Sequence, residues 1–376
     1  MGIIGMERRL EGQEIFYYIK NYYTTYRGND MEFDSYKKAG VDIEAAMKTK
    51  RGIREMVRST FRPEVLTDIG AFGGLFKPDF TGMNEPVLVS SADGVGTKLK
   101  VAYMTGRHNT VGADLVNHCC NDILVMGARP LFFLDYLAYA QHDDDMVRAV
   151  ISGIASACIT NKCALIGGEM AELPDMYRAG EYDLAGVIIG VVGEHEILDS
   201  SLVCEDDIIL GLASTGLHTN GFSLARKLIF EIAGLNPGDQ LPGTDRSVAD
   251  ELLAVHRSYG PSLQPLIGSG GIHAMAHITG GGFPENVNRS LPAELNAVID
   301  IDSWEVPPIF RFLEKTGNLS EKELYRTFNM GVGMVLIVDK HEVEDVSNSL
   351  RNSGETVFTI GYIEIGSQQV RLVHGL

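Results

Sequence analysis

The sequence predicts an α+β fold in two domains, a mixed α/β domain followed by an α+β domain. Its 376 residues suffice for two domains of ordinary size, and 45% hydrophobic residues can fill both cores. Strand and helix patterns mix without the strict alternation of a doubly wound sheet. Polarity rises over 195–207 before the strand pattern restarts, so we expect an N-terminal extension over 1–34 and domains over 35–198 and 199–376.

Hydrophobic spacing and turn residues predict the elements of the first domain. Ile53, Met56 and Val57 recur at helical spacing, and Arg62-Pro63 lies beyond the end of that helix. The apolar run "EPVLVSSA" is typical of a strand, whereas the dense glycines of "GAFGGLF" are typical of a turn. The predicted helices are 49–58, 110–126 and 143–161, and the predicted strands are 85–92, 131–138, 163–169 and 182–194.

The second domain reads as strands and helices in irregular order. A loop rich in Gly, Pro and Asp extends to residue 245, and glycines cluster at 280–282. The predicted strands are 208–215, 295–301, 331–339 and 357–366, and the predicted helices are 221–234, 307–316, 321–329 and 341–353, with others inside 247–268.

The composition excludes several functional classes. A formal net charge of −18 without a basic stripe argues against a general surface for nucleic acid or anionic membranes. No apolar run is long enough to span a bilayer and no signal peptide is apparent, so we expect a cytoplasmic protein. The five cysteines fit neither zinc spacing nor a disulfide framework, and we expect buried, reduced thiols.

The stretch "SADGVGTKLK" places a carboxylate, two glycines and an ammonium directly after a predicted strand. Asp93 suits a hard cation, Gly94 and Gly96 let backbone N–H groups approach an anion, and Lys98 adds a point charge. A P-loop is excluded because Thr97 separates Gly96 from Lys98. Two interpretations stay open here: a site for nucleotide phosphate and metal, or an ordinary strand-to-helix turn with a salt bridge.

Short polar side chains occupy one face of the predicted helix 110–126, namely Asp114, Asn117, His118, Asn121 and Asp122. A solvated helix face would usually carry longer Lys, Glu, Gln or Arg side chains. The face is therefore either a surface for a cation or ligand or a buried, hydrogen-bonded seam.

Carboxylates also gather at the ends of predicted strands in the first domain. Glu169 follows paired glycines in "LIGGE", and Asp135 lies in "FFLDYLA". Together with Asp93 and Asp122 they would repel one another unless a metal or protons intervene. Magnesium with a nucleotide phosphate is the economical explanation.

Two loops of the second domain have the features of ligand-binding turns. In "GLHTNGFSLARK", Asn220 or Ser223 is expected to cap a helix, and His218 is either a general acid or base or a hydrogen-bonded structural histidine. In "HITGGGFPENV", Gly280–Gly282 precede Pro284, which suits the first position of a helix. This second loop is a candidate anion cradle.

These motifs resemble, in order, those of the phosphoribosylformylglycinamidine cyclo-ligase (aminoimidazole ribonucleotide synthetase) family over about 35–370. The matching segments are "SYKKAGVDIEAAMK", "STFRPEVLTDIGAFGGLF", "SADGVGTKLKVA", "CCNDILVMGARPLFFLDYLA", "ALIGGEMAELPDMY", "GLHTNGFSLARK", "HITGGGFPENV" and "YRTFNMGVGMVLIV". The resemblance implies ATP-dependent ring closure in purine biosynthesis. It also implies Mg²⁺, a ribonucleotide substrate, and a homodimer whose first domains pair their sheets.

The resemblance further implies roles for particular residues. Asp93, Lys98 and His218 are expected to be catalytic, and Asp93, Asp122 and Glu169 to hold the metal. The expected ATP contacts are Lys37, Asp42, Gly94, Gly96, Thr97, Lys98 and Asn121, with 36–43 closing over the nucleotide. The expected substrate contacts are His218, Asn220, Gly221, Gly280, Gly281 and Gly282.

Two other functions share many of these features. A small-molecule kinase of the same ATP-binding superfamily would transfer phosphate to a stable product. A non-catalytic nucleotide-binding dimer would bind ATP without turnover. The match of the second-domain motifs favours the cyclo-ligase over the kinase, and the charged residues of the site favour an enzyme over the silent dimer.

Overall fold

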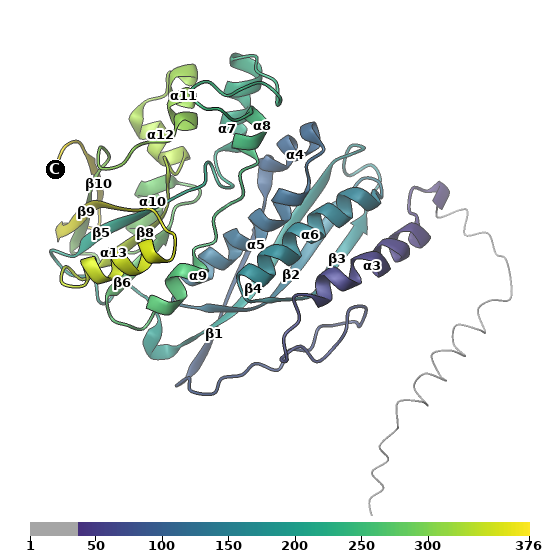
Figure 1. The fold of residues 1–376 in the computed structure, drawn as a ribbon, viewed down its shortest axis with the longest axis horizontal. Coiled ribbons are helices and arrows are strands. Elements are labelled where there is room, and N and C mark those ends of the chain that lie inside the picture. The colour runs from purple at the N-terminus through teal and green to yellow at the C-terminus, as the bar shows by residue number, and fades with distance from the viewer. Residues whose placement is uncertain (1–36) are drawn as a thin grey trace, which may run out of the picture.

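The computed structural model describes residues 37–376, which form two sheets with helices packed around them (Figure 1). The first sheet has four strands in the order β1-β4-β2-β3, and the second has six in the order β10-β7-β9-β5-β8-β6. The two-domain α+β prediction is confirmed. The predicted extension over 1–34 lies outside the described residues.

The first sheet consists of β1 (Pro86–Gly94), β2 (Arg129–Tyr139), β3 (Ala164–Glu172) and β4 (Tyr182–Gly193). Strand β4 pairs antiparallel with both β1 and β2, while β2 and β3 are parallel. The carboxyl ends of β1, β2 and β3 therefore lie at the same end of the sheet.

Helices α3 (Ile43–Arg58), α5 (Asn109–Leu124) and α6 (Asp144–Thr160) cover one face of this sheet, and the short α4 (Leu99–Thr105) follows β1 (Figure 1). Two glycines allow α5 and α6 to pack closely. A Cβ on Gly112 would overlap the carbonyl oxygen of Val150, and one on Gly153 would overlap that of Asn109. Backbone therefore contacts backbone where these helices meet.

The opposite face of the first sheet contacts no helix of the described chain. Every second residue of β1 is exposed. Leu88 is 63% exposed, Tyr136 of β2 is 43% exposed and Val187 of β4 is 37% exposed. The register places these three side chains on the face away from α5, so a partly apolar surface is left open.

The second sheet is built around a completely buried strand, β8 (Val332–Val338). Its neighbours β5 (Ile208–Ala213) and β6 (Ile272–His277) pair with it antiparallel. Further out are β9 (Val357–Ile365), β7 (Leu295–Asp300) and β10 (Val370–Val373).

The helices of the second domain are short. Those that follow β5 are α7 (Phe222–Arg226), which continues as a π-helical turn over Lys227–Ile232, α8 (Val248–Leu252) and α9 (Gly260–Leu263). The later helices are α10 (Gly282–Asn288), α11 (Pro308–Gly317), α12 (Glu321–Thr327) and α13 (Val343–Asn352). No helix among residues 37–376 is long and apolar enough to cross a membrane.

Several sequence-based expectations need correction. Strands β6 and β10 and helix α4 were not predicted, and the predicted helix 221–234 changes from α7 to the π-helical turn. Gly221 rather than Asn220 or Ser223 is the N-cap of α7, and Pro284 is the third residue of α10 rather than the first. Four of the five cysteines are buried as expected, but Cys204 is exposed.

Replacing Gly112 with Ala should destabilise the protein by about 1–3 kcal/mol, because the new methyl group must push α5 away from α6. The free energy of unfolding in denaturant measures this change. Gly238→Ala is the matched control, since a Cβ there meets no atom within 4 Å. Equal stability of the two variants would show that the helices do not depend on this close approach.

Candidate active site between the two domains

The "DGVGTK" motif lies where the two domains meet. Asp93 and Gly94 end β1, and Gly96–Lys98 form one 3₁₀ turn before α4. The Thr97 hydroxyl lies 3.0 Å from the hydroxyl of Ser223, which belongs to α7 of the other domain. The motif therefore makes a domain contact as well as a strand-to-helix turn.

Lys98 is completely buried, and three groups accept hydrogen bonds from its ammonium. They are Asp114 Oδ1 at 2.9 Å, the carbonyl oxygen of His218 at 3.1 Å and that of Ala254 at 2.7 Å. Burial lowers the pKa of Lys98 and raises that of Asp114, while their mutual attraction opposes both shifts. An ammonium has three donors, so none remains for a phosphate. The geometry gives no support to a phosphate contact by Lys98.

The polar face of α5 binds the extended segment 254–259 of the second domain. Asn117 Nδ2 donates to the His256 carbonyl oxygen at 2.7 Å, and Asn121 Nδ2 donates to that of Arg257 at 2.8 Å. Asn121 Oδ1 accepts from the backbone N–H of Tyr259 at 3.1 Å. The buried-seam interpretation thus holds for this part of the face, and the geometry gives no support to an ATP contact by Asn121.

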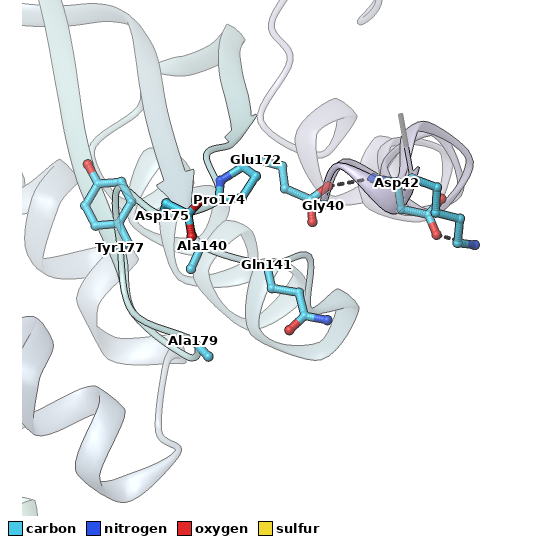
Figure 2. Close-up of a pocket in the computed structure, with 10 residues that line it drawn as sticks. Gly40, Asp42, Ala140, Gln141, Glu172, Pro174, Asp175, Tyr177 and Ala179 are labelled. Atoms are coloured by element: carbon cyan, nitrogen blue, oxygen red, sulfur yellow. Dashed lines mark hydrogen bonds and ion pairs between the residues drawn. The ribbon is translucent and has the colours of Figure 1, made fainter. Parts of the chain in front are cut away.

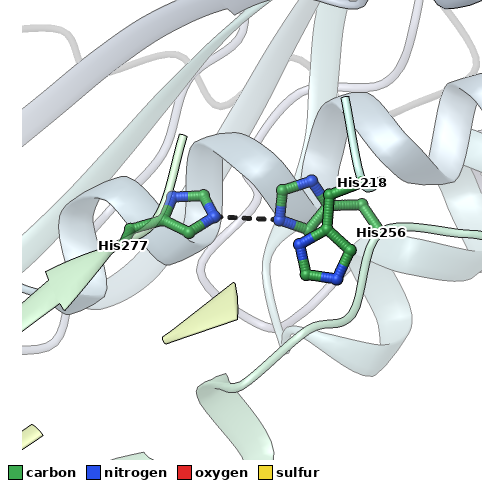
Figure 3. A group of neighbouring side chains, drawn as sticks. All are labelled: His218, His256 and His277. Atoms are coloured by element: carbon green, nitrogen blue, oxygen red, sulfur yellow. Dashed lines mark hydrogen bonds between the residues drawn. The ribbon is translucent and has the colours of Figure 1, made fainter. Parts of the chain in front are cut away.

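Four histidines from both domains meet beside this seam: His118, His218, His256 and His277. His256 Nε2 and His277 Nε2 are 2.9 Å apart, and the rings of His218 and His256 stack at 4.0 Å (Figure 3). His118 Nδ1 lies 2.6 Å from the Thr219 hydroxyl. His256 and His277 were not among the predicted site residues, although His277 directly precedes the glycine loop in "HITGGG".

Two of the predicted metal ligands flank the histidines. Asp93 Oδ2 is 2.8 Å from His118 Nε2, and Asp122 Oδ1 is 2.8 Å from His277 Nδ1. Asp122 Oδ2 is also 3.7 Å from His118 Nε2, so both carboxylates face the same imidazole. The Asp93 side chain remains 41% exposed, which leaves it accessible to a ligand.

The histidines hold both carboxylates in the ionised form. Burial acts to raise the pKa of Asp93 and of Asp122, but the hydrogen bond and charge of His118 lower the first and those of His277 lower the second, and both end below their usual values. Burial acts to lower the pKa of His118, yet the two carboxylates outweigh it and raise that pKa. The site is therefore two ionised carboxylates around an imidazole whose protonation they favour.

A chain of polar contacts joins the two carboxylates through three histidines. His118 contacts Asp93 and the Thr219 hydroxyl, which lies 3.3 Å from His256 Nδ1. Asn121 Nδ2 lies 3.2 Å from His256 Nε2, the same nitrogen that is 2.9 Å from His277 Nε2, and His277 Nδ1 is 2.8 Å from Asp122. Burial lowers the pKa of His256 and of His277.

His218 is oriented by backbone rather than by solvent. Its Nε2 accepts from the N–H of Thr215 at 3.2 Å, and its Nδ1 has no hydrogen-bond partner within the described chain. Burial lowers the pKa of His218 well below its usual value, so the ring is neutral near pH 7. These contacts fit the structural interpretation of His218 better than a solvent-facing acid or base.

The two predicted substrate loops of the second domain adjoin each other. A Cβ on Gly280 would lie 3.4 Å from Asn220 Oδ1, and Asn286 Nδ2 donates to the carbonyl oxygens of Gly280 and Gly282 at 3.2 and 2.8 Å. Gly281 and Gly282 have positive φ values of 91° and 61°. Gly221 also has a positive φ of 78°, and its Cβ would overlap the Phe328 ring.

The predicted ATP segment forms a separate cavity at the end of β3. Lys37, Gly40 and Asp42 line a space of about 400 Å³ together with Glu172 and Tyr177 (Figure 2). Glu172 Oε2 accepts from the backbone N–H of Asp42 at 2.8 Å, and Lys37 Nζ lies 2.7 Å from Asp42. Asp42 also caps α3.

Glu169, the third predicted metal ligand, does not lie near Asp93 and Asp122 within one chain. It pairs with Tyr136 and therefore shares the open face of the sheet, whereas Asp93 faces His118 on α5. Strand β3 is also three positions from β1, or about 14 Å at a strand spacing of about 4.8 Å. Only Asp93 and Asp122 converge within one chain.

Comparison with known proteins identifies the family. The family model described as AIR synthase related protein, N-terminal domain, matches residues 80–192, and the corresponding C-terminal model matches 205–373. A phosphoribosylformylglycinamidine cyclo-ligase of Geotalea daltonii is 50% identical over 342 residues, which cover 90% of this chain and 98% of the relative. The chain belongs to the phosphoribosylformylglycinamidine cyclo-ligase family. A relative of the same name in Brevibacillus brevis is 44% identical over 337 residues, covering 90% of this chain and 97% of the relative.

The cyclo-ligase family shares its fold with other solved structures. Thiamine-monophosphate kinase from Stenotrophomonas maltophilia matches with a TM-score of 0.63 and 20% identity, covering 87% of this chain and 95% of that one. The hydrogenase maturation protein HypE in complex with ATP matches with a TM-score of 0.61 and 18% identity, covering 86% and 90%. At these identities the matches establish the fold alone.

Replacing Lys98 with Met should destabilise the protein by about 3–5 kcal/mol, because Asp114 would stay buried without its partner. Denaturant unfolding measures the loss. The double variant Lys98→Met/Asp114→Leu should recover much of it, since both charges are then removed. A single variant within about 1 kcal/mol of the unmodified protein would show that the pair does not hold the domains together.

Proposed function

We propose that this chain converts formylglycinamidine ribonucleotide to 5-aminoimidazole ribonucleotide, with ATP converted to ADP and phosphate, in purine biosynthesis. The observation that carries this proposal is 50% identity across 98% of the length of a named phosphoribosylformylglycinamidine cyclo-ligase. The ordered motifs of both domains support it, because ring closure needs nucleotide and ribonucleotide sites together.

In the proposed reaction the formyl amide oxygen attacks the γ-phosphorus of ATP, and ADP leaves. The ribose-bearing amidine nitrogen then attacks the activated formyl carbon, the C–O bond breaks, and phosphate departs with its electrons. The amide N–H proton is lost on phosphorylation and the amidine N–H proton on ring closure, and transfer of one proton from the ring CH2 carbon to the exocyclic imine nitrogen makes the ring aromatic. This chemistry requires alignment and charge neutralisation more than a protein nucleophile.

Asp93 and Asp122 are the residues we propose to hold magnesium. Their oxygen donors suit a hard cation, and their ionised state means that no proton must be displaced. Magnesium, when bound, would neutralise phosphate charge. His118 and His277 would keep the two carboxylates oriented, and Lys98 would act by fixing the position of α5 rather than by touching phosphate.

Nucleotide and substrate contacts can be proposed on the same basis. Lys37 and Asp42 would contact ATP from the cavity that they line, and the backbone of Gly94–Thr97 would face its phosphates. The adjoining loops around Asn220 and Gly280–Gly282 would bind the ribonucleotide. The five cysteines form no disulfide, which fits the reducing cytoplasm where we propose that the enzyme works. We also propose that its two domains span 35–198 and 199–376.

We also propose a homodimer formed through the open face of the first sheet. Leu88, Tyr136 and Val187 are exposed there, and an apolar sheet face is normally covered. Glu169 shares this face, so pairing of two sheets would place it near the interface. Its proposed contact with metal would then depend on the dimer.

The reaction can be tested with the purified protein, Mg·ATP and formylglycinamidine ribonucleotide. We expect equal amounts of ADP and 5-aminoimidazole ribonucleotide. In the same assay Asp93→Asn should lower kcat/KM for Mg·ATP at least about 100-fold because a metal ligand is lost, with little change in unfolding midpoint.

The exposed Asp245→Asn is the control and should keep full activity. ADP with a stable phosphorylated product would instead indicate a kinase, and no turnover would indicate a nucleotide-binding dimer. Unchanged use of Mg·ATP by Asp93→Asn would remove that residue from the metal site.

Replacing Val187 with Glu should convert the proposed dimer to a monomer, because two buried carboxylates would face each other across the interface. Sedimentation equilibrium measures the mass. Ile232→Glu places the same charge on an exposed residue of the second domain and should leave the mass unchanged. If Val187→Glu still forms a dimer with an unchanged dissociation constant, the interface does not include this face of the sheet.

A further inference from the structure

A cluster of metal-ligating side chains lies at the end of the second sheet away from the histidines. Cys204 and Asp207 belong to the turn that enters β5, His273 is near the start of β6, and Asp339 follows β8. The register brings these strand ends together, since Ile208 and Ile272 both pair with Val338. The cluster is outside the site described above.

Asp207 is the centre of this cluster. Its Oδ1 lies 3.3 Å from Cys204 Sγ, and its Oδ2 lies 2.7 Å from His273 Nδ1. Asp207 Oδ2 also accepts from the backbone N–H of Cys204 at 2.9 Å, which fixes the carboxylate. On the other side of the imidazole, His273 Nε2 is 3.9 Å from Asp339 Oδ2.

We propose that Cys204 Sγ, Asp207 and His273 Nδ1 form a binding site for a borderline-soft divalent transition metal such as Zn²⁺. The proposal is independent of the cyclo-ligase reaction. One sulfur, one nitrogen and one carboxylate are the donors that zinc uses, whereas magnesium and calcium take oxygen. Cys204 is exposed, so the ion can enter and keep a water as fourth ligand.

The charges and protons of the complex balance. Burial and the neighbouring Asp207 raise the pKa of Cys204, so the free thiol is protonated near neutral pH. Binding breaks the S–H bond and releases that proton to solvent, and the thiolate and carboxylate together match the charge of M²⁺. The imidazole proton moves from Nδ1 to Nε2, where Asp339 accepts it as an outer partner.

The geometry needs only small side-chain movements. Zinc bonds of about 2.3 Å to sulfur and about 2.0–2.2 Å to nitrogen or oxygen place tetrahedral ligand atoms about 3.4–3.6 Å apart. Cys204 Sγ is now 3.3 Å from Asp207 Oδ1 and His273 Nδ1 is 2.7 Å from Asp207 Oδ2, and one ligand atom from each of the three residues lies within 4.8 Å of the others.

The test uses the full-length chain with Co²⁺ as a spectroscopic probe, in excess Mg²⁺ that occupies oxygen-rich sites. We expect one equivalent of Co²⁺ to release about one proton and to give a thiolate charge-transfer band and tetrahedral visible bands, and Zn²⁺ to displace it without further proton release. Cys204→Ser should abolish the thiolate band. Asp339→Asn should weaken Zn²⁺ binding by about 10- to 100-fold while keeping the band.

Cys158→Ala is the matched control, because it removes a buried thiol elsewhere and should keep both the band and the affinity. Circular dichroism and the unfolding midpoint confirm that each variant is folded. The proposal is overturned if the unmodified protein gives no thiolate band, if the band survives in Cys204→Ser, or if it disappears in Cys158→Ala. Unchanged Zn²⁺ affinity in Asp339→Asn would exclude Asp339 as the outer partner.

Discussion

The buried ion pair between Lys98 and Asp114 fixes how the two domains meet. A charge moved out of water costs several kcal/mol unless it is paired and hydrogen-bonded. The Lys98 ammonium meets this condition with one carboxylate from its own domain and two carbonyl oxygens, of His218 and Ala254, from the other. Separation of the domains would take the two carbonyl oxygens from Lys98 and the backbone N–H of His256 from Asp114, so the docked arrangement is preferred.

This docking also determines the chemistry of the cleft. With α5 held against the segment 254–259, His118 meets Asp93 while His277 reaches Asp122 from the second domain. Each carboxylate then has a histidine partner, which offsets the repulsion between two acids that face the same imidazole. An ionised, oriented pair of oxygen donors is thus ready for a cation before any ligand binds.

Sequence reasoning located much of this site, but it could not assign partners. The polar face of α5 followed from helical spacing alone, whereas whether Asn121 binds a ligand or a backbone depends on a segment more than 130 residues away. In the sequence Lys98 resembled a phosphate ligand because it follows the glycines of "DGVGTK". Only the tertiary structure reveals the three groups that accept hydrogen bonds from its ammonium. Strand β6 was missed because "IHAMAH" is short, and its burial comes from pairing with β8. Glu169 and Asp93 were both predicted near strand ends, yet strand order and side-chain alternation place them on different faces.

Strand β6 links the cleft to the opposite end of the second sheet. His277 ends the strand beside Asp122, and His273 lies four residues earlier beside Asp207, about 13 Å away at about 3.3 Å per residue. The chain passes between its two sheets once, through 194–207, and the turn that ends this link carries Cys204 and Asp207. An ion at that turn would hold the link against β6, the strand that positions His277. The interdomain connection and the cleft histidine His277 would therefore both be held by one buried strand, β6.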